Sequence, residues 1–221
     1  SQASIPLMMQ AEQADIPVIA FDSGVEDSDV PVTTAATDNK AAAALAAKRM
    51  AAEIGDKGEV AIVAHDQTSV SGINRRDGFV QYMKQHTPGV EIVDIQYGGG
   101  DPLESTDLAK SILQAHPGLD GIFGTNEGSA IGVVNAVQEL GKDGDLSVVG
   151  FDSGAEQINA IKSGLMTGAI TQDPIDIGYQ TVKAAVAVIN GKEVPPVIHT
   201  DYYWYDKSNI DNPEIQSTLY R

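Results

Sequence analysis

Hydrogen-bonding side chains stand at or beside the ends of several short apolar runs in this chain. They are mostly carboxylates and amides, at Asp22, His65, Asp66, Gln67, Asp101, Thr125, Asn126, Glu127, Asp152, Gln172 and Asp173, and the guanidinium groups of Arg75 and Arg76 lie in the first turn of a helix beside them. Carboxylate and amide oxygens accept hydrogen bonds, and arginine donates them in a fixed fork. Each hydroxyl of a sugar donates one hydrogen bond and accepts others, so this set suits a polyhydroxylated ligand. Aromatic rings available for stacking on such a ligand are Phe21, Tyr97, Phe123, Tyr203 and Trp204.

Several of these polar residues also have a purely structural interpretation. Asp22 and Asp152 both precede Ser-Gly, where an aspartate commonly closes a turn after a strand. Asn126 is placed to cap a helix, and Glu127 to serve as a first-turn carboxylate that complements the helix dipole. Of the adjacent arginines at 75 and 76, the helical position favours Arg75 as the inward one.

Other kinds of chemistry find little support in the sequence. The four histidines are scattered without metal-ligand spacing, and the chain has no cysteine, so we predict no metal site and no disulfide. The glycines at 98–100 lack the phosphate-loop pattern, no G-x-S-x-G elbow exposes a nucleophile, and no G-x-G-x-x-G follows a strand. We therefore predict no cofactor and no catalytic residue. A pair of glycosidase carboxylates stays open, although its usual scaffold is longer.

Composition narrows the class of partner. The 221 residues carry a formal net charge of −17, which repels phosphate backbones and argues against nucleic-acid binding. Hydrophobic residues make up 42% of the chain, as in ordinary globular proteins. No run reaches the roughly 18 apolar residues of a membrane-spanning helix.

Strand and helix patterns alternate along the chain, which predicts an α/β fold. Strands are expected at 18–21, 59–64, 91–95, 121–124, 147–151, 167–171 and 197–203, and helices at 5–14, 39–54, 72–84, 106–115, 128–140, 155–162 and 174–190. Such alternation favours parallel sheets covered by helices on both faces, with ligands outside the carboxyl ends of the strands. The polar tail after Tyr205 is expected to wrap irregularly over the surface.

One four-residue sequence occurs twice. Phe-Asp-Ser-Gly ends the apolar runs at both 21–24 and 151–154. The repeat predicts two similar α/β lobes, each of which presents an aspartate at a strand end.

Together these motifs resemble a known family. The matching words are IPVIAFDS (16–23), ATDN (36–39), RRDGF (75–79), FGTNEGSAIG (123–132), VVGFDSG (148–154) and ITQDP–IGY (170–179). In this order they are similar to the type I periplasmic solute-binding proteins of ABC transporters, in particular the ribose and simple-sugar group of the lactose-repressor-like superfamily. The resemblance implies two Rossmann-like lobes with parallel sheets, joined by three crossovers around a ligand cleft.

The resemblance also assigns ligand-binding positions. Asp22 and Asp152 match the strand-end aspartates of the two lobes, Arg75 and Asn126 match the sugar-binding arginine and asparagine, and Gln172 matches the hinge glutamine. Two positions depart from the pattern: Ser23 replaces an arginine common in ribose binders, and Gly100 replaces an aromatic residue. These departures weigh against ribose itself but leave the sugar class intact.

The resemblance further implies an incomplete N-terminal lobe, because the first three strands of the family have no counterpart. Residues 1–36 and 173–194 are expected to form the remnant of that lobe, and residues 37–172 and 195–221 the C-terminal lobe with its tail. We expect either a longer native chain or pairing with a second copy to cover the exposed surface.

The expected function is non-enzymatic. The chain would capture a small sugar or related polyol in an interlobe cleft and deliver it to the membrane permease of an ABC transporter. It would act in the periplasm, or outside the cell on a lipid anchor upstream. The alternative is the effector-binding domain of a lactose-repressor-like regulator, against which the charge of −17 argues. A sugar-processing enzyme is a third reading, which no catalytic motif supports.

Overall fold

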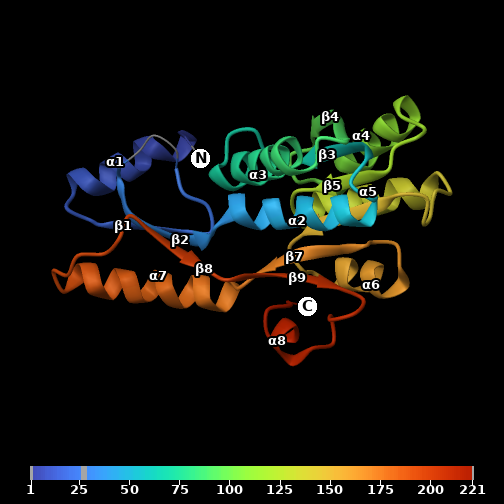
Figure 1. Cartoon of the computed structure of the whole chain (residues 1–221). Helices are drawn as coiled ribbons and strands as arrows, with labels where there is room; N and C mark the ends of the chain where they lie inside the picture. The colour runs from blue at the N-terminus through green and yellow to red at the C-terminus, as the bar shows by residue number, and fades with distance from the viewer. Residues whose placement is uncertain (1, 26–28, 221) are drawn as a thin grey trace.

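Two β-sheets organise the part of the chain described by the computed structural model, residues 2–25 and 29–220. One sheet is three-stranded with the order β1-β2-β8, and the other is six-stranded with the order β4-β3-β5-β6-β7-β9. Figure 1 shows the two sheets side by side, each with its own helices. We call these two parts the smaller lobe and the larger lobe. The predicted α/β fold with two parallel-sheet lobes is confirmed.

The larger sheet is parallel except at one edge. Its strands are β3 (Gly58–Ala64), β4 (Val90–Tyr97), β5 (Gly121–Gly124), β6 (Ser147–Phe151), β7 (Gly168–Gln172) and β9 (Tyr202–Asp206). Only β9 runs antiparallel, beside β7. Every residue of β5 and β6 is buried, as expected of strands covered on both faces.

Helices cover both faces of this sheet. They are α2 (Asn39–Glu53), α3 (Val70–His86), α4 (Pro102–Ala115), α5 (Glu127–Glu139) and α6 (Ala155–Ser163). Alternate residues of β3 enter two separate cores: Val60 and Ile62 pack with the helices α2 and α3, whereas Val63 packs with α4 and α5. Gly78 lets α3 approach α2 closely, because a Cβ there would lie 2.2 Å from the Lys40 carbonyl oxygen.

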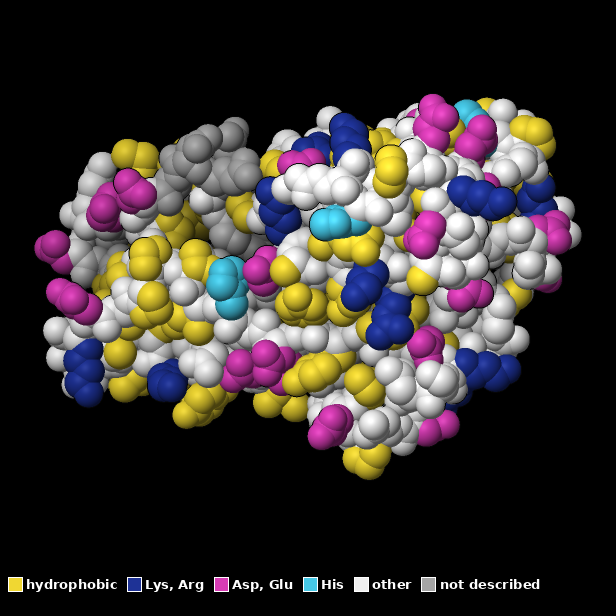
Figure 2. Space-filling view, viewed as in Figure 1, with side chains coloured by type: hydrophobic (Ala, Val, Ile, Leu, Met, Phe, Trp, Pro, Cys, Tyr) yellow, Lys and Arg dark blue, Asp and Glu magenta, His cyan; other side chains and the backbone are white. Residues whose placement is uncertain are grey.

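The smaller lobe is built on fewer elements. They are the short 3-10 helix η1 (Gln2–Ser4), α1 (Ile5–Gln13), β1 (Val18–Phe21), β2 (Pro31–Thr37), α7 (Pro174–Ile189) and β8 (Val197–Thr200). Helix α7 packs on β1 and β2, yet only Ile177 and Ala184 of this helix are buried. Its apolar residues at 175, 179, 182, 186 and 189 are exposed. Figure 2 shows hydrophobic side chains gathered over this lobe.

Two features of the smaller lobe differ from the sequence prediction. No strand was expected between 18–21 and 59–64, but residues 31–37 form β2, the central strand of the smaller sheet. The single strand expected at 197–203 is two strands, β8 and β9, which belong to different sheets. Pairing of β8 with β2 therefore puts residues 197–200 in the smaller lobe, and the expected assignment of 195–221 to the larger lobe was wrong there.

Three connections join the lobes within the described residues. They follow Thr37 into α2, follow Gln172 into α7, and pass through Asp201 between β8 and β9. Asp38 caps α2, since its carboxylate accepts a hydrogen bond of 3.0 Å from the Ala41 amide. After β9 the chain ends in a tail that contains α8 (Pro213–Gln216). No helix among the described residues has the length and apolarity needed to cross a membrane.

Candidate functional site

The topology of the larger sheet has a switch point at the carboxyl ends of β3 and β5. The chain leaves β3 for β4 on one side and returns to β5 on the other, so the connections after β3 and β5 diverge. Ligands of doubly wound sheets bind at such a point. Here His65, after β3, donates its amide to Thr125 Oγ1 at 2.9 Å, and its ring Nδ1 lies 2.8 Å from the same oxygen.

Hydrogen bonds and a ring contact hold Arg75 beside this switch point. The residue is 3% exposed, and its Nε donates to Asn39 Oδ1 at 2.7 Å while its Nη1 donates to the Thr125 carbonyl at 3.0 Å. The guanidinium lies over the Phe151 ring, 3.7 Å from the ring centroid. Within the described part of the chain Nη2 has no hydrogen-bond partner, so it is free to donate to a ligand.

Asp152 faces the same guanidinium. Its Oδ2 lies 3.6 Å from Arg75 Nη1 and accepts a hydrogen bond of 3.2 Å from the Glu127 amide, at the positive end of α5. Its Oδ1 accepts a hydrogen bond of 2.7 Å from Gln172 Nε2. The carboxylate is therefore oriented from two sides before any ligand arrives.

The repeated Phe-Asp-Ser-Gly sequence adopts the same local structure in both lobes. Asp22 has a φ of 63° and Asp152 a φ of 77°, in the left-handed region that aspartate tolerates better than most residues. The Asp22 amide donates to the Ala35 carbonyl on the neighbouring strand β2 at 2.9 Å, and the Asp152 amide donates to the Ile170 carbonyl on β7 at 2.7 Å. Each lobe thus turns one aspartate outward at a strand end.

The charge of Asp152 affects the pKa of Asp22 across the lobes. Burial raises the pKa of Asp22; Arg75 offsets part of this increase, and the charge of Asp152 adds to it. Burial also lowers the pKa of His65 to about 4, with Arg75 as the next cause, so its imidazole is neutral at pH 7. The lobes touch beside Asp22, where Ser23 Oγ accepts a hydrogen bond of 3.3 Å from the Ser71 amide.

Gln172 links Asp152 to the connections between the lobes. Its Oε1 accepts a hydrogen bond of 2.9 Å from Thr37 Oγ1, while its Nε2 holds Asp152. Thr37 and Gln172 are the last residues of β2 and β7, just before two of the connections. The side chain of Gln172 can therefore transmit the relative position of the lobes to the carboxylate.

Asn126 lies at the same rim with one atom already engaged. Its Oδ1 caps α5 by accepting a hydrogen bond of 2.9 Å from the Ser129 amide, so the structural interpretation holds for this oxygen. Its Nδ2 points toward Gly100, where a Cβ would lie 3.0 Å away. The amide nitrogen is the part of Asn126 that remains for a ligand.

Sequence reasoning missed several residues that shape the site. Asn39 and Phe151 hold and underlie the Arg75 guanidinium, although neither was singled out. Their positions beside the Asp38 cap and the strand-end Asp152 were the available signals. Conversely, Phe123 is fully buried and stacks on Phe79 at 4.7 Å, so it cannot stack on a ligand.

Other expectations for stacking and charge also change. Trp204 is 6% exposed and donates its Nε1 to Asp206, which removes it from the stacking candidates. Arg76, the second arginine of the pair, donates its Nη1 to the Tyr97 hydroxyl at 2.8 Å, so this hydroxyl already has a partner. Among the described residues no group of three or more His, Asp or Glu side chains could hold a metal ion.

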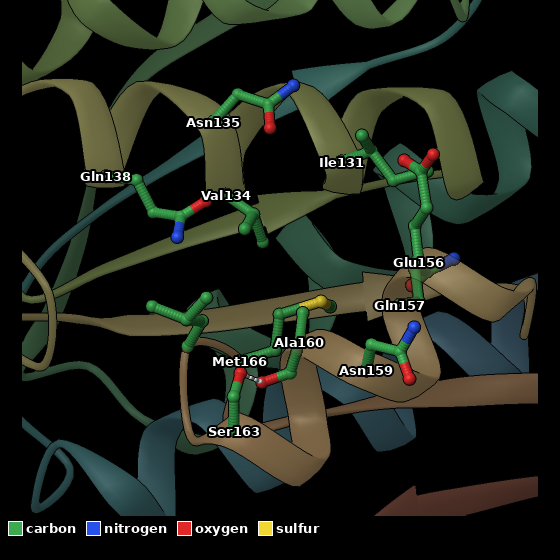
Figure 3. A pocket seen from close by; sticks show the side chains of 11 residues that line it. Ile131, Val134, Asn135, Gln138, Glu156, Gln157, Asn159, Ala160, Ser163 and Met166 are labelled. Carbon is green, nitrogen blue, oxygen red and sulfur yellow. Dashed lines mark hydrogen bonds between the residues drawn. The ribbon is translucent and has the colours of Figure 1, made fainter.

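One cavity lies beside the predicted site residues and another lies away from them. The first, of about 240 Å³, lies between the lobes beside Asp22. It is lined by Asp22, Thr34 and His199 from the smaller lobe and Asn39, Val70 and Asn74 from the larger. Another, of about 310 Å³, lies between α5 and α6, and Glu156 is the only ionisable side chain among its lining residues. Figure 3 shows Asn135 and Gln138 facing Ala160 and Ser163 across it, and none of the predicted site residues lines it.

The sequence of this chain is similar to those of curated bacterial sugar-binding proteins. The chain is 34% identical to the D-allose-binding periplasmic protein of Escherichia coli over 161 residues, which is 72% of this chain and 51% of the relative. It is 30% identical to the ribose import binding protein RbsB of Salmonella typhimurium over 83% of this chain and 61% of the relative. The chain thus spans about half to three fifths of these curated relatives.

Solved structures agree with this relationship. An ABC transporter solute-binding protein from Agrobacterium vitis with bound D-fucose superposes with a TM-score of 0.92 at 32% identity, over 97% of this chain and 74% of that one. A second from the same organism, bound to α-D-tagatopyranose, gives a TM-score of 0.93 at 31% identity, over 99% and 76% of the two chains. The family model described as a periplasmic binding protein domain matches residues 1–193. The predicted resemblance is confirmed, and the chain belongs to the periplasmic binding protein family, with the type I fold.

Proposed function

We propose that this chain is the sugar-binding component of an ABC transporter. It captures a small sugar or related polyol at the cluster of Asp22, Arg75, Asn126, Asp152 and Gln172, and it delivers the ligand to a membrane permease. The observation that carries this proposal is the pair of equivalent strand-end aspartates, one from each lobe, near one buried arginine: Arg75 lies 3.6 Å from Asp152, and its charge offsets part of the rise that burial causes in the pKa of Asp22. A sugar between the lobes would receive hydrogen bonds from Arg75 and give them to both carboxylates.

The ligand class rests on the donor and acceptor set and on the relatives. The relatives are named for D-allose and ribose, and the superposed structures hold D-fucose and α-D-tagatopyranose. All four ligands are monosaccharides with several hydroxyls. Ser23 supplies a short hydroxyl instead of a long guanidinium, so this side of the site makes fewer charged contacts than a ribose binder with arginine there.

The proposed role is binding without turnover. The Asp152 carboxylate already accepts hydrogen bonds from Gln172 and Glu127 and lies beside Arg75, so it is oriented to accept a hydrogen bond from a ligand hydroxyl. Such a group holds a hydroxyl in the ground state, whereas catalysis requires stronger interactions in the transition state. We place this function in the periplasm, or outside the cell if a lipid anchor lies upstream, and we expect no nucleic-acid partner.

Calorimetric titration tests the proposal with D-allose, D-ribose, D-fucose, D-tagatose and D-arabinose. We expect at least one sugar to bind the wild-type chain, and Asp152→Asn to weaken that binding by about 10- to 150-fold, the range for a hydrogen bond to a charged group. The matched control is Asp107→Asn, whose side chain is 85% exposed on α4, and it should bind like wild type. Absence of binding to every sugar at millimolar concentration, or equal binding by Asp152→Asn, would overturn the proposal.

A further inference from the structure

The C-terminal tail, residues 207–220, packs closely against the larger lobe. Ile210 and Ile215 are buried in the core formed with α5 and α6, and Asn209 Nδ2 donates to the Trp204 carbonyl at 3.0 Å. Figure 1 shows the tail and α8 beside β9. The sequence suggested an irregular surface segment, whereas these contacts anchor it.

The end of the tail reaches the neighbours of two predicted ligand-binding residues. The Thr218 carbonyl lies 3.2 Å from Thr171 Oγ1, and Thr171 directly precedes Gln172. The Tyr220 hydroxyl accepts a hydrogen bond of 3.3 Å from the Ser153 amide, and Ser153 directly follows Asp152. The tail therefore contacts the back of the strand ends that carry the site.

Tyr220 also contacts the residue that orients Asp152 from α5. Its hydroxyl donates to Glu127 Oε2 at 3.3 Å, and the Glu127 amide donates to Asp152 Oδ2 at 3.2 Å. The Glu127 carboxylate lies directly over the turn after Asp152, because a Cβ on Gly154 would collide with Glu127 Oε1. One phenol oxygen thus joins the turn at 152–154 to the first residue of α5.

The surroundings of Tyr220 keep its hydroxyl in one place. Although the residue is 40% exposed, desolvation of its hydroxyl and the nearby charges of Asp152 and Glu127 raise the pKa of the phenol, which stays a donor at all physiological pH values. Ser153 is fully buried, so its amide would lose its acceptor if the hydroxyl were removed. Tyr205 supports the same turn, donating its hydroxyl to the Asp152 carbonyl at 2.7 Å.

We propose that Tyr220 is a positioning residue for the sugar site: its hydroxyl fixes Glu127 and the turn 152–154, and through them the orientation of the Asp152 carboxylate. Tyr220 itself need not touch the ligand. The proposal rests on the proposed function and adds the C-terminal tail to the determinants of affinity. It predicts that loss of the Tyr220 hydroxyl contacts weakens sugar binding even when the larger lobe and the rest of the tail stay folded.

The decisive variant is Tyr220→Phe, which keeps the ring and deletes the hydroxyl. We expect the tightest-binding sugar of the panel to bind about fivefold more weakly, as for loss of one hydrogen bond. The matched control is Ile210→Val, which loosens the buried part of the same tail without touching the site; its affinity should equal that of wild type. Affinity within about twofold of wild type in Tyr220→Phe, or an equal loss in Ile210→Val, would overturn the proposal.

A second measurement, without ligand, separates this proposal from the proposed function. Carbon-13 NMR follows the carboxyl resonances of Asp152 and Glu127 in the free protein during a pH titration. In Tyr220→Phe we expect the pKa of Glu127 to rise, because the hydroxyl that lowers it is gone, and the Asp152 resonance to shift. If the wild-type chain binds no sugar, the proposed function is wrong. If the Asp152 resonance is unchanged in Tyr220→Phe, the proposal that Tyr220 positions Asp152 is wrong, whether or not a sugar binds.

Discussion

The buried ion pair between Arg75 and Asp152 should make a large coupled contribution to stability. Their side chains are 4% and 13% exposed, and Nη1 lies 3.6 Å from Oδ2. Removing one partner of a buried pair typically costs about 3–5 kcal/mol, because the other charge is left uncompensated. For Asp152→Asn we expect about 3 kcal/mol, since Asp22 still faces the guanidinium and asparagine also tolerates the left-handed backbone.

The coupling follows from a double-mutant cycle. Arg75→Met should also lower the free energy of unfolding by about 3–4 kcal/mol. The double variant should lower it by about 4–5 kcal/mol, less than the sum of the two single effects, because both charges of the pair are removed together. The expected coupling energy is about 2 kcal/mol. Urea unfolding measures it, with the fluorescence of the single tryptophan, Trp204, as the probe.

The surface pair of Lys162 and Asp211 is the matched control. These groups are closer, at 3.1 Å, but their side chains are 43% and 82% exposed, so water screens their attraction. A cycle with Lys162→Met and Asp211→Asn should give about 0–1 kcal/mol. If the buried pair couples no more strongly than this surface pair, burial does not strengthen the site as we have reasoned.

Four further results are expected. The pKa of His65 falls from 6.5 to about 4 in the folded chain, so the free energy of unfolding should decrease as the pH falls from 6.5 toward 4, by up to about 3 kcal/mol. Unfolding of wild type and of His65→Gln at several pH values measures this decrease. Parallel pH profiles of the two proteins would contradict it. The raised pKa of Asp22 has the opposite sign, so Asp22→Asn should increase the free energy of unfolding at pH 7 while weakening sugar binding; a loss of stability with intact affinity would refute its role. Gly78→Ala should destabilise the larger lobe by about 1–3 kcal/mol in urea unfolding, since its Cβ would meet the Lys40 carbonyl, and a neutral effect would show that α2 and α3 separate freely. Mass spectrometry after prolonged incubation with the sugar panel should recover every sugar unaltered, and conversion that depends on the protein would contradict a binding role.

The parts of the fold that sequence predicts best are those with strong local patterns. The alternating apolar runs place most strands of the larger sheet, and the repeated Phe-Asp-Ser-Gly predicts that Asp22 and Asp152 occupy equivalent turns. Strand β2 escaped prediction because its threonines and alanines carry no strong apolar signal, and its strand conformation depends on β1 and β8 beside it. The division between β8 and β9 likewise depends on a crossover that local pattern does not encode.

The site shows the same limit. Polar strand-end residues are visible in the sequence, so Arg75 and Asp152 could be chosen from type and position alone. The residues that fix them come from distant segments: Asn39 contacts Arg75 across 36 positions, and Tyr220 contacts Glu127 across 93. Such long-range contacts leave no periodicity in the sequence, and they become visible only when the sheets are assembled.

The most direct test of the central claim is a crystal structure of this chain with the tightest-binding sugar of the panel. We predict a sugar between the lobes, with one hydroxyl within about 2.7–3.2 Å of the Asp152 carboxylate and another within that distance of Arg75 Nη2. A sugar that occupies the cavity between α5 and α6 instead, or that touches neither Asp152 nor Arg75, would contradict the assignment of the site.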